Sequence, residues 1–539
     1  MKQKKNIALV SLPFVLTAGM VAGIFIGKVM NTQRLSPAQE KFMSLLGLID
    51  EEYVDEINVD SLLEEALPDL FAHLDPHSVY IPKSELTSVN QELDNSFSGV
   101  GISFQMLGDS VVVVEVVPGG PAEKVGIMAG DRIVSANGIS LAGPEVTTDS
   151  VYRTLRGKEG TKALLKVKRQ NSRKLLDFDV VRGKIPVNSV DAIYTAAPGV
   201  GYLRVGKFGT GTYDEFFNAL NSLKSKGASR FIVDLRGNTG GYMDQAILMA
   251  NEFLPRGSMI VYSKGRLPIN ESVGVADGNG AFQDAELVVL IDEYSASASE
   301  IFAGAIQDND RGLVVGRRSF GKGLVQNQTL LPDSSAVRLT VARYFTPSGR
   351  CIQKEYKRGS DGKYEMDIVD RYNHGEFYNP DSIRLDKSKR FTTVGGRTVY
   401  GGGGIMPDIF VAQDTTGYTS YYINAVNSGL IQKFAFQVVE KYRPVLKGVK
   451  TLQQLNGVIP RDNTLLENFV AYAAANGLPA RWYYINMSRD QLLSQIKSVI
   501  ARDVLGYSDF IRSLNQSDPT VIKAVEALTE GKSPVVIKK

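Results

Sequence analysis

Strand and helix patterns alternate between residues 199 and 317, and this alternation constrains the fold more than any other feature of the chain. The apolar runs "GVGYLRVGKF", "SRFIVDL", "AELVVLIDE" and "GLVVGRR" are typical of buried strands. Three helical patterns separate them: "TYDEFFNALNSLKSKG", "GYMDQAILMANEFL" and "SASEIFAGAIQDN". Strands joined by crossover helices form a mixed α/β sheet that the helices cover, so we expect such a sheet here.

The segments on either side of this region have other textures. Residues 35–95 are mostly helical in pattern, and short β runs such as "GVGISFQ" and "DSVVVVEVV" begin at Ser96 and end near Lys184. Residues 355–400 are charged and irregular, which predicts a solvated insertion, and "GGGGIMPDIFV" then returns to a core-like pattern. From about residue 416 to residue 530 the pattern is helical.

The composition excludes several classes of protein. Lys plus Arg is 61 and Asp plus Glu is 58, a net charge of +3, which is too balanced for a nucleic-acid binder. The single cysteine, Cys351, excludes an intrachain disulfide and a zinc site made of thiolates. The chain has three histidines, His73, His77 and His374, and their spacing does not suggest a metal site. We therefore expect no metal and no cofactor.

The first thirty residues suggest a membrane segment. Lys2, Lys4 and Lys5 precede an uncharged run, residues 6–27, which as a helix would be about 33 Å long and would cross a bilayer. A cleaved signal peptide has a shorter apolar core and a small-x-small exit, for which "VAG" is a weak candidate. We therefore favour an uncleaved anchor, with the rest of the chain facing outward because the lysines precede the span.

The stretch "YSASASEIFAGAIQDN", residues 294–309, contains three serines at a predicted strand-to-helix turn. Ser297 and Glu300 have the spacing of a capping box, so Ser297 is a candidate helix cap. The same position also suits a nucleophile, because the next amide, that of Ala298, and the helix dipole would stabilise an oxyanion. Both interpretations stay open from this stretch alone.

A serine nucleophile needs a base, and the distinctive candidate is Lys322 in "SFGKGLVQ". A lysine acts as a base only when neutral, and burial lowers its free pKa of about 10.4 by several units. A third stretch, "DLRGNTGG" at 234–241, ends a buried strand in a glycine turn whose amides could face an oxyanion or a phosphate. An exposed loop lysine and an ordinary tight turn are the structural alternatives.

Two other enzyme classes have weaker support. "GRRSFGKG" approaches the phosphate loop of nucleotide hydrolases, but Gly323 stands where the magnesium-binding hydroxyl is needed, and a strand pattern rather than a helix follows. Ser494 and Lys497 have the spacing of the penicillin-binding signature, but they lie within a helical pattern without the accompanying motifs.

Taken together, the motifs resemble those of the C-terminal processing peptidases, also called tail-specific proteases. "DLRGNTGG", "YSASASEIFAGAIQD" and "SFGKGLVQ" occur in the family's order, and residues 96–184 resemble its PDZ domain. "LDPHSVYIP", "GYLRVGKF" and "GGGGIMPD" also resemble family segments. The resemblance implies a serine peptidase with a Ser-Lys dyad. Its nucleophile falls on Ser297 and its base on Lys322, with Gln326 orienting the lysine and with the oxyanion amides at Ala298, Gly240 and Gly241.

The PDZ-like segment can also be interpreted from its own residues, without the family resemblance. "SGVGIS" is a glycine-flanked loop before a strand, and the amides of such a loop can hold a terminal carboxylate while the peptide adds beside the strand. The helical pattern at 148–157 would form the other wall. This places the groove at Gly99, Val100, Gly101 and Ile102, unless the domain is only a spacer.

We therefore predict a multidomain α+β protein with five parts: a membrane anchor or signal segment at 1–30, a helical region at 31–95, a PDZ domain at 96–184, a mixed α/β protease core at 185–415 with an insertion near 355–400, and a helical domain at 416–539. The expected function is a serine endopeptidase of the cell envelope that cleaves proteins near their C-terminal tails. It would be anchored in the inner membrane and face the periplasm or exterior, or be secreted if the N-terminal segment is cleaved. Its expected partners are protein substrates, the membrane through residues 6–27, and an adaptor or a second copy of the chain. A catalytically silent PDZ scaffold is the alternative function.

Overall fold

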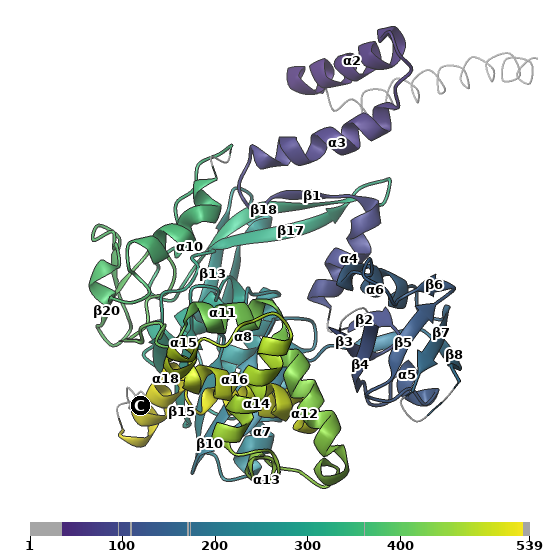
Figure 1. Cartoon of the computed structure of the whole chain (residues 1–539). Helices are drawn as coiled ribbons and strands as arrows, with labels where there is room; N and C mark the ends of the chain where they lie inside the picture. The colour runs from purple at the N-terminus through teal and green to yellow at the C-terminus, as the bar shows by residue number, and fades with distance from the viewer. Residues whose placement is uncertain are drawn as a thin grey trace, which may run out of the picture. The chain divides into compact units, whose positions relative to one another are not determined.

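The computed structural model of the chain describes residues 35–94, 96–107, 110–169, 172, 174–359 and 362–531 (Figure 1). The chain divides into two compact units, residues 1–71 and residues 72–539. None of the helices in the described ranges has the length and apolar character needed to span a bilayer. The predicted anchor at residues 6–27 lies outside those ranges.

The first unit contains two helices in its described part, as the sequence predicts. Helix α2 spans Pro37–Glu52 and begins with a capping box between Ser36 and Gln39, and helix α3 spans Val59–Ala72. Neither helix has a buried residue, and Phe42, Leu45 and Leu48 are each about half exposed.

The predicted PDZ-like segment forms its own β domain around a small apolar core. Its sheet has the order β3-β4-β5-β7-β8, with β6 paired to β5, so β3 lies at an edge. Val111, Ile133, Val151 and Leu165 lie in the core and are at most 1% exposed. The elements are β2 (Ser96–Gly99), β3 (Ile102–Leu107), β4 (Ser110–Val116), α5 (Pro121–Lys124), β5 (Arg132–Ala136), β6 (Ile139–Ser140), α6 (Thr148–Leu155), β7 (Lys162–Lys168), β8 (Leu176–Val181) and β9 (Gly183–Pro186), which pairs with β2.

A six-stranded sheet forms the centre of the predicted protease core, in the order β10-β11-β12-β15-β16-β21. All neighbouring strands are parallel except β10, which is antiparallel to β11. This confirms the mixed α/β sheet expected from the alternating pattern. The strands are β10 (Val190–Ala197), β11 (Val200–Val205), β12 (Arg230–Asp234), β15 (Glu286–Ile291), β16 (Leu313–Gly316) and β21 (Ile409–Phe410).

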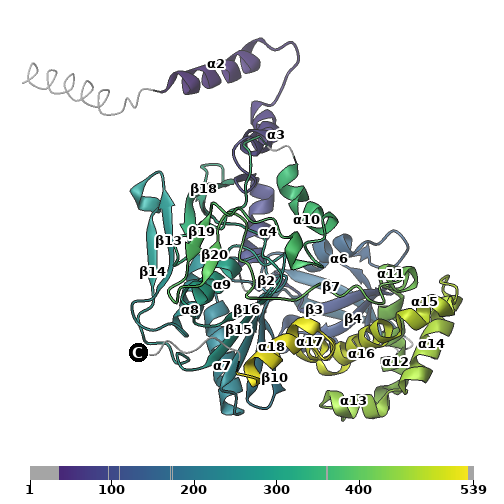
Figure 2. The same ribbon diagram turned by 90° about the vertical axis from the view of Figure 1, so that its left-hand side faces the viewer.

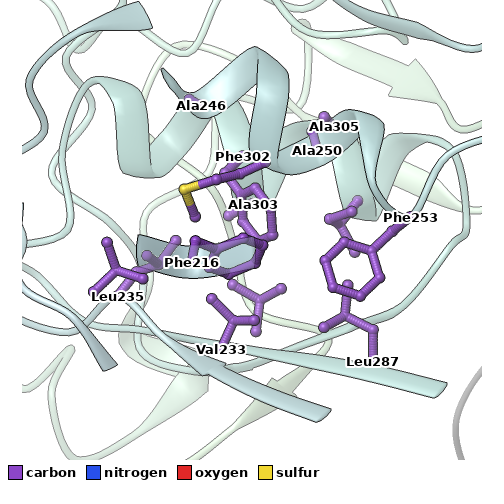
Figure 3. Packing of buried hydrophobic residues seen from close by; sticks show 14 of the residues in the cluster. Phe216, Val233, Leu235, Ala246, Ala250, Phe253, Leu287, Phe302, Ala303 and Ala305 are labelled. Carbon is purple, nitrogen blue, oxygen red and sulfur yellow. The ribbon is translucent and has the colours of Figure 1, made fainter. Parts of the chain in front are cut away.

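Three helices cover one face of this sheet: α7 (Thr212–Ser225), α8 (Met243–Asn251) and α9 (Ala298–Asp308) (Figure 3). Side chains of alternate strand residues, such as Val233 and Leu287, pack against Phe216 and Phe302 of these helices. Every residue of α9 is buried, so the helix that follows Ser297 is held on all sides.

The other face of the sheet is covered by the end of the chain. Helices α17 (Tyr507–Asn515) and α18 (Pro519–Thr529) place Ile511, Val521 and Ala524 in one apolar cluster with strand residues such as Val288 and Leu290. Figures 1 and 2 show α18 beside the central sheet. The last two helices of the C-terminal helical region therefore also pack on the central sheet.

The remaining helices of the C-terminal part share a separate apolar cluster that runs from Tyr421 to Ala501. Leu465, Phe469 and Ile496 are buried in it. This agrees with the helical domain expected there. The helices are α11 (Ser420–Asn427), α12 (Leu430–Leu446), α13 (Leu452–Val458), α14 (Asp462–Ala475), α15 (Trp482–Met487) and α16 (Arg489–Leu505).

A second sheet has the order β1-β18-β13-β14, with β17 also paired to β18. The segment 355–400 follows it and contains α10 (Lys363–Asn373), a short 3-10 helix η2 (Pro380–Ser382) and the hairpin β19 (Arg390–Thr392) and β20 (Thr398–Tyr400). The strands of the sheet are β1 (Val79–Ile81), β13 (Met259–Gly265), β14 (Ser272–Val275), β17 (Leu324–Leu330) and β18 (Ala336–Phe345). The 3-10 helix η1 (Pro268–Asn270) lies between β13 and β14, and α4 (Lys83–Leu93) follows β1.

The position of α18 leads to a stability prediction. Ala524→Asp should lower the free energy of unfolding by about 3 kcal/mol or more, because it buries a charge without a partner against the sheet. Ala524 is 0% exposed. The matched variant Lys523→Asp puts the same side chain at the next, exposed position of the helix and should change the stability by less than about 1 kcal/mol. Chemical denaturation of the two variants tests this, and equal stabilities would show that α18 is not part of the core.

Candidate active site

Ser297 lies at the turn between β15 and the fully buried helix α9. Its backbone has φ +56° and ψ −114°, a combination that non-glycine residues rarely adopt. It takes the N-cap position of α9, and its amide donates a hydrogen bond to Oε2 of Glu300 at 2.9 Å. A strained serine on a sharp strand-to-helix turn is the local geometry that exposes a nucleophile above a sheet.

The two neighbouring serines have other partners. The Ser295 hydroxyl donates to the carbonyl oxygen of Leu235 at 2.8 Å, and the Ser299 hydroxyl donates to that of Asn238 at 2.9 Å. Both residues are 0% exposed, whereas Ser297 is partly exposed. Ser295 and Ser299 thus fasten the serine turn to the loop that follows β12, and Ser297 is the serine of the three that solvent or a substrate can reach.

The glycine turn of "DLRGNTGG" lies directly against Ser297. A Cβ atom on Gly240 would come within 2.7 Å of the Ser297 Cβ and 3.0 Å of the Ala298 amide nitrogen, so only glycine allows this approach. The Gly240 amide donates to Oδ1 of Asn238 at 2.8 Å. Within the described part of the chain, the amides of Gly241 and Ala298 have no acceptor. Of the two glycines expected to supply an oxyanion amide, Gly241 is therefore the one with a free donor.

Lys322 lies in the loop between β16 and β17, flanked by two glycines. Burial lowers the pKa of its side chain below the ordinary 10.5, and the nearby Arg338 cation lowers it further. The carboxylates of Glu300 and Asp75 act in the opposite direction. The net lowering moves the lysine toward the neutral form that a general base requires.

The Glu300 carboxylate connects the serine turn to the lysine loop. Its Oε2 atom accepts from the amides of Ser297 at 2.9 Å and Lys322 at 2.8 Å. Its Oε1 atom accepts from the Gly321 amide at 2.7 Å and the Ser319 hydroxyl at 2.5 Å. The side chain is 0% exposed, and burial raises its pKa to about 7 despite these donors. The capping-box spacing predicts the bond to Ser297, but no sequence pattern indicated the bonds to the lysine loop.

A second connection comes from β18. The Tyr344 hydroxyl lies 2.6 Å from the carbonyl oxygen of Lys322 and 3.1 Å from that of Ser297. Tyr344 is 1% exposed, so this contact is sealed from solvent. Two buried side chains thus link the same pair of segments, one through their amides and one through their carbonyls.

Gln326 lies on β17, four residues after Lys322. Its Nε2 atom is 3.4 Å from Oγ1 of Thr340, and that hydroxyl donates to Oδ1 of Asp75 at 2.9 Å. The orientation of Lys322 by Gln326 stays a prediction, since the hydrogen bond seen here goes to Thr340. His77, in the same turn as Asp75, lies 2.7 Å from the Tyr364 hydroxyl, and burial followed by the Lys322 charge lowers its pKa to about 4.

The segment 355–400 supports the lysine loop through a few buried side chains, while most of its described residues are exposed or half-buried, in line with the expected solvated insertion. Arg371 of α10 donates to the carbonyl oxygens of Arg318 at 2.7 Å and Ser319 at 3.0 Å. Glu376 accepts from both Arg318 and Arg371, and Arg371 and Glu376 are each 2% exposed. Arg371 and Glu376 are thus paired inside the protein, whereas other charged residues of the segment, such as Lys357 and Glu365, are exposed.

The PDZ-like domain has the groove elements that the sequence predicts. Strand β3 is at the sheet edge, and its Phe104 packs on Tyr152 of α6 with ring centroids 5.0 Å apart. In the loop before β3, the carbonyls of Val100 and Gly101 accept from Ala122 and Val117. The amides of the same two residues have no acceptor in the described ranges.

Comparison with known proteins agrees with this arrangement. Residues 199–362 match the model of peptidase family S41, residues 98–180 match the PDZ domain, and residues 421–506 match a family of unknown function. The carboxy-terminal processing protease CtpB of Bacillus subtilis is 31% identical over 362 residues, which cover 65% of this chain and 72% of that protein.

Two further proteins are similar to this chain, one with a lower coverage of its own length and the other with a low TM-score. A probable CtpA-like serine protease of Staphylococcus aureus (strain MRSA252) is 33% identical over 340 residues, 62% of this chain and 66% of its own length. The solved photosystem II D1 C-terminal processing protease is 26% identical over 70% of this chain and 94% of that one, with a TM-score of 0.34. On its sequence and its domains, the chain belongs to peptidase family S41, among the carboxy-terminal processing proteases.

Proposed function

We propose that this protein is a serine endopeptidase in which Ser297 is the nucleophile and Lys322 the general base. One observation carries the proposal: a single buried carboxylate, Glu300, accepts hydrogen bonds from the amides of both residues. They are 322 − 297 = 25 positions apart in the sequence, and this contact holds their backbones at one place in the fold. The lowered pKa of Lys322 favours the neutral amine, which is the form that can accept a proton from the serine.

The proposed reaction is an acyl transfer in two halves. Neutral Lys322 takes the proton from the Ser297 hydroxyl as Oγ attacks the scissile carbonyl, and the amides of Ala298 and Gly241 stabilise the oxyanion. The lysine ammonium then gives its proton to the leaving amine, which releases the C-terminal product and leaves an acyl group on Ser297. In the second half, neutral Lys322 accepts a proton from water as the water oxygen attacks the acyl ester, and the lysine ammonium then returns that proton to Oγ of Ser297, which releases the N-terminal product as an acid.

We propose that the PDZ domain selects the substrate by its C-terminus. The free amides of Val100 and Gly101, the edge strand β3 and the wall formed by α6 support this role. Gly99 and Ile102 flank the loop, and an apolar terminal side chain would gain burial in the groove. The substrates are then proteins with free, small or apolar C-terminal residues.

Substitution of the three serines tests the nucleophile. Ser297→Ala should abolish peptide cleavage and leave the fold intact, since the side chain is partly exposed. Ser295→Ala and Ser299→Ala should keep turnover but lower the free energy of unfolding by about 0.5–1.5 kcal/mol, because each removes a buried hydrogen bond to a carbonyl that keeps only its backbone donor. Cleavage of a fluorogenic peptide and thermal unfolding give the two readouts. Turnover by folded Ser297→Ala at the wild-type rate would rule the assignment out.

The pH dependence of cleavage tests the base. The rate should rise with pH through a midpoint below 10.5, because only neutral lysine accepts the serine proton. The Asp75 carboxylate raises the pKa of Lys322, so Asp75→Asn should move the midpoint to lower pH. The Arg338 cation lowers it, so Arg338→Gln should move the midpoint to higher pH. Shifts of the same sign in both variants, or none in either, would contradict Lys322 as the titrating group.

The role of the PDZ domain is tested on one peptide that carries either a free carboxylate or an amide at its C-terminus. The peptide with the free carboxylate should be cleaved at least about tenfold faster than the amidated peptide. A carboxylate that accepts hydrogen bonds from several backbone N–H groups contributes more than about 1 kcal/mol to binding. The terminal residue is Ala in both peptides. Equal rates for the acid and the amide would show that the domain does not select tails.

We also propose that the protein is anchored at the outer face of the cytoplasmic membrane by residues 6–27, on the basis of the uncharged run and the lysines before it. Carbonate extraction of cell membranes should leave the protein in the pellet. A variant without residues 1–30 should instead be recovered in the supernatant. Release of the full chain by carbonate, or a mature N-terminus after residue 22, would favour a peripheral or cleaved form.

A further inference from the structure

The segment that follows β18 and the insertion enclose a cavity of about 890 Å³ beside the lysine loop. Its floor is the extended stretch from Cys351 to Arg358, and α10 and the hairpin β19–β20 contribute other walls. A volume of this size is typical of sites that bind small ligands or several side chains. The family's catalytic motifs do not include the insertion residues that line it.

The cavity is strongly cationic. Two of the side chains that line it are acidic, and both are already paired: Asp367 with Lys354 at 3.1 Å, and Glu355 with Lys389 at 3.1 Å. Six of the lining side chains are cationic. Three of these, Arg343, Lys357 and Arg358, make no ion pair with any residue that the structure describes. The six are Arg343, Lys354, Lys357, Arg358, Lys363 and Lys389.

The walls between these cations are aromatic. Phe345, Tyr356, Tyr364 and Phe391 line the cavity, and Tyr364 packs edge to face with Tyr356. Lys354 is 6% exposed, with its Nζ atom 4.2 Å from the centre of the Tyr364 ring. A site with cations over aromatic walls suits a ligand that has both carboxylates and apolar carbon, as an acidic stretch of polypeptide does.

The cavity is adjacent to the proposed base. The Lys354 amide donates to the carbonyl oxygen of Gly321 at 2.9 Å, and Oε1 of Gln353 accepts from the Gly323 amide at 2.8 Å. On another side, His77 lies 2.7 Å from the hydroxyl of the wall residue Tyr364 and is close enough to Lys322 for that charge to act on it. A polypeptide bound at Ser297 therefore has its neighbouring residues within reach of this cavity.

We propose that the cavity is a substrate subsite that binds acidic side chains of the polypeptide a few residues from the scissile bond. The inference rests on the proposed function, because the occupant is the chain being cleaved. Arg343, Lys357 and Arg358 are the cations free to pair with it, and the aromatic walls receive its apolar carbons. The protease then discriminates among substrates at two places, by the C-terminal carboxylate at the PDZ groove and by acidic residues next to the cleavage site.

The experiment uses matched peptides with one cleavage site and one C-terminus. In one set, Asp or Glu is placed in turn at each position within four residues of the scissile bond, and in the other set Asn or Gln replaces it. In the wild type, the acidic peptide at one or two positions should have a kcat/KM about tenfold higher than its neutral partner. The difference should lie mainly in KM, and about 0.5 M salt should reduce it.

The variant Lys357→Glu/Arg358→Glu should remove this preference and leave the neutral peptides within about twofold of the wild-type rate. Both residues are exposed, so the fold should be kept. The variant Lys224→Glu/Lys226→Glu makes the same change of net charge at the C-terminal end of α7, outside the cavity, and should keep the preference.

Three results would overturn the inference. The first is equal cleavage of acidic and neutral peptides by the wild type at every position. The second is an equal loss of the preference for acidic peptides in the cavity variant and in the α7 variant, which would indicate long-range electrostatic attraction of the peptide rather than binding in the cavity. The third is a change in the cleavage of neutral peptides when ATP is added to the wild type but not to the cavity variant, which would make the cavity an effector site. Failure of the wild type to cleave any peptide would instead contradict the proposed function.

Discussion

The buried carboxylate of Glu300 is the interaction on which the arrangement of the site depends. It accepts four hydrogen bonds, one from the serine turn and three from the lysine loop, and it is 0% exposed. A buried carboxylate is costly unless its acceptor capacity is used, and here the amides and the hydroxyl use it. All four donors bind the same carboxyl group, so the two loops are held in one relative position. Tyr344 adds a matching contact to the carbonyls of Lys322 and Ser297.

The topology explains why these segments meet. Strands β12, β15 and β16 are parallel neighbours, and the turn with Gly240–Gly241, the serine turn and the lysine loop each follow the carboxyl end of one of them. In open α/β sheets, sites form at that edge. Gly240 then lies directly against Ser297, and Ser297 is at the N-terminus of α9, the positive end of that helix's dipole. The sheet thus brings together Gly240, Ser297 and Lys322, which are 297 − 240 = 57 and 322 − 297 = 25 residues apart along the chain.

Local features of the fold and the site could be predicted from the sequence, and features that need tertiary contacts could not. The apolar runs predicted the strands of the central sheet. The spacing of Ser297 and Glu300 predicted the hydrogen bond between the Ser297 amide and the Glu300 carboxylate at the start of α9. The bonds of Glu300 to the lysine loop depend on how two distant segments approach, which no local pattern encodes. The buried pair of Arg371 and Glu376 could not be predicted, because a charged, irregular stretch does not show which of its charges meet in the fold. The apolar stripe of α18 shows that one face is buried, but not that it is buried against the central sheet.

The central claim is that Ser297, activated by Lys322, carries the acyl group during turnover, and direct detection of that intermediate tests it. The wild type is mixed with an activated ester substrate, quenched with acid during the burst phase, and digested for peptide mapping by mass spectrometry. The account predicts one acylated side chain, Ser297, and at least about a hundredfold slower acylation in Lys322→Ala, since loss of a general base typically costs that much or more. Acylation of Ser295 or Ser299 instead, or acylation of Ser297 at an unchanged rate in Lys322→Ala, would contradict it.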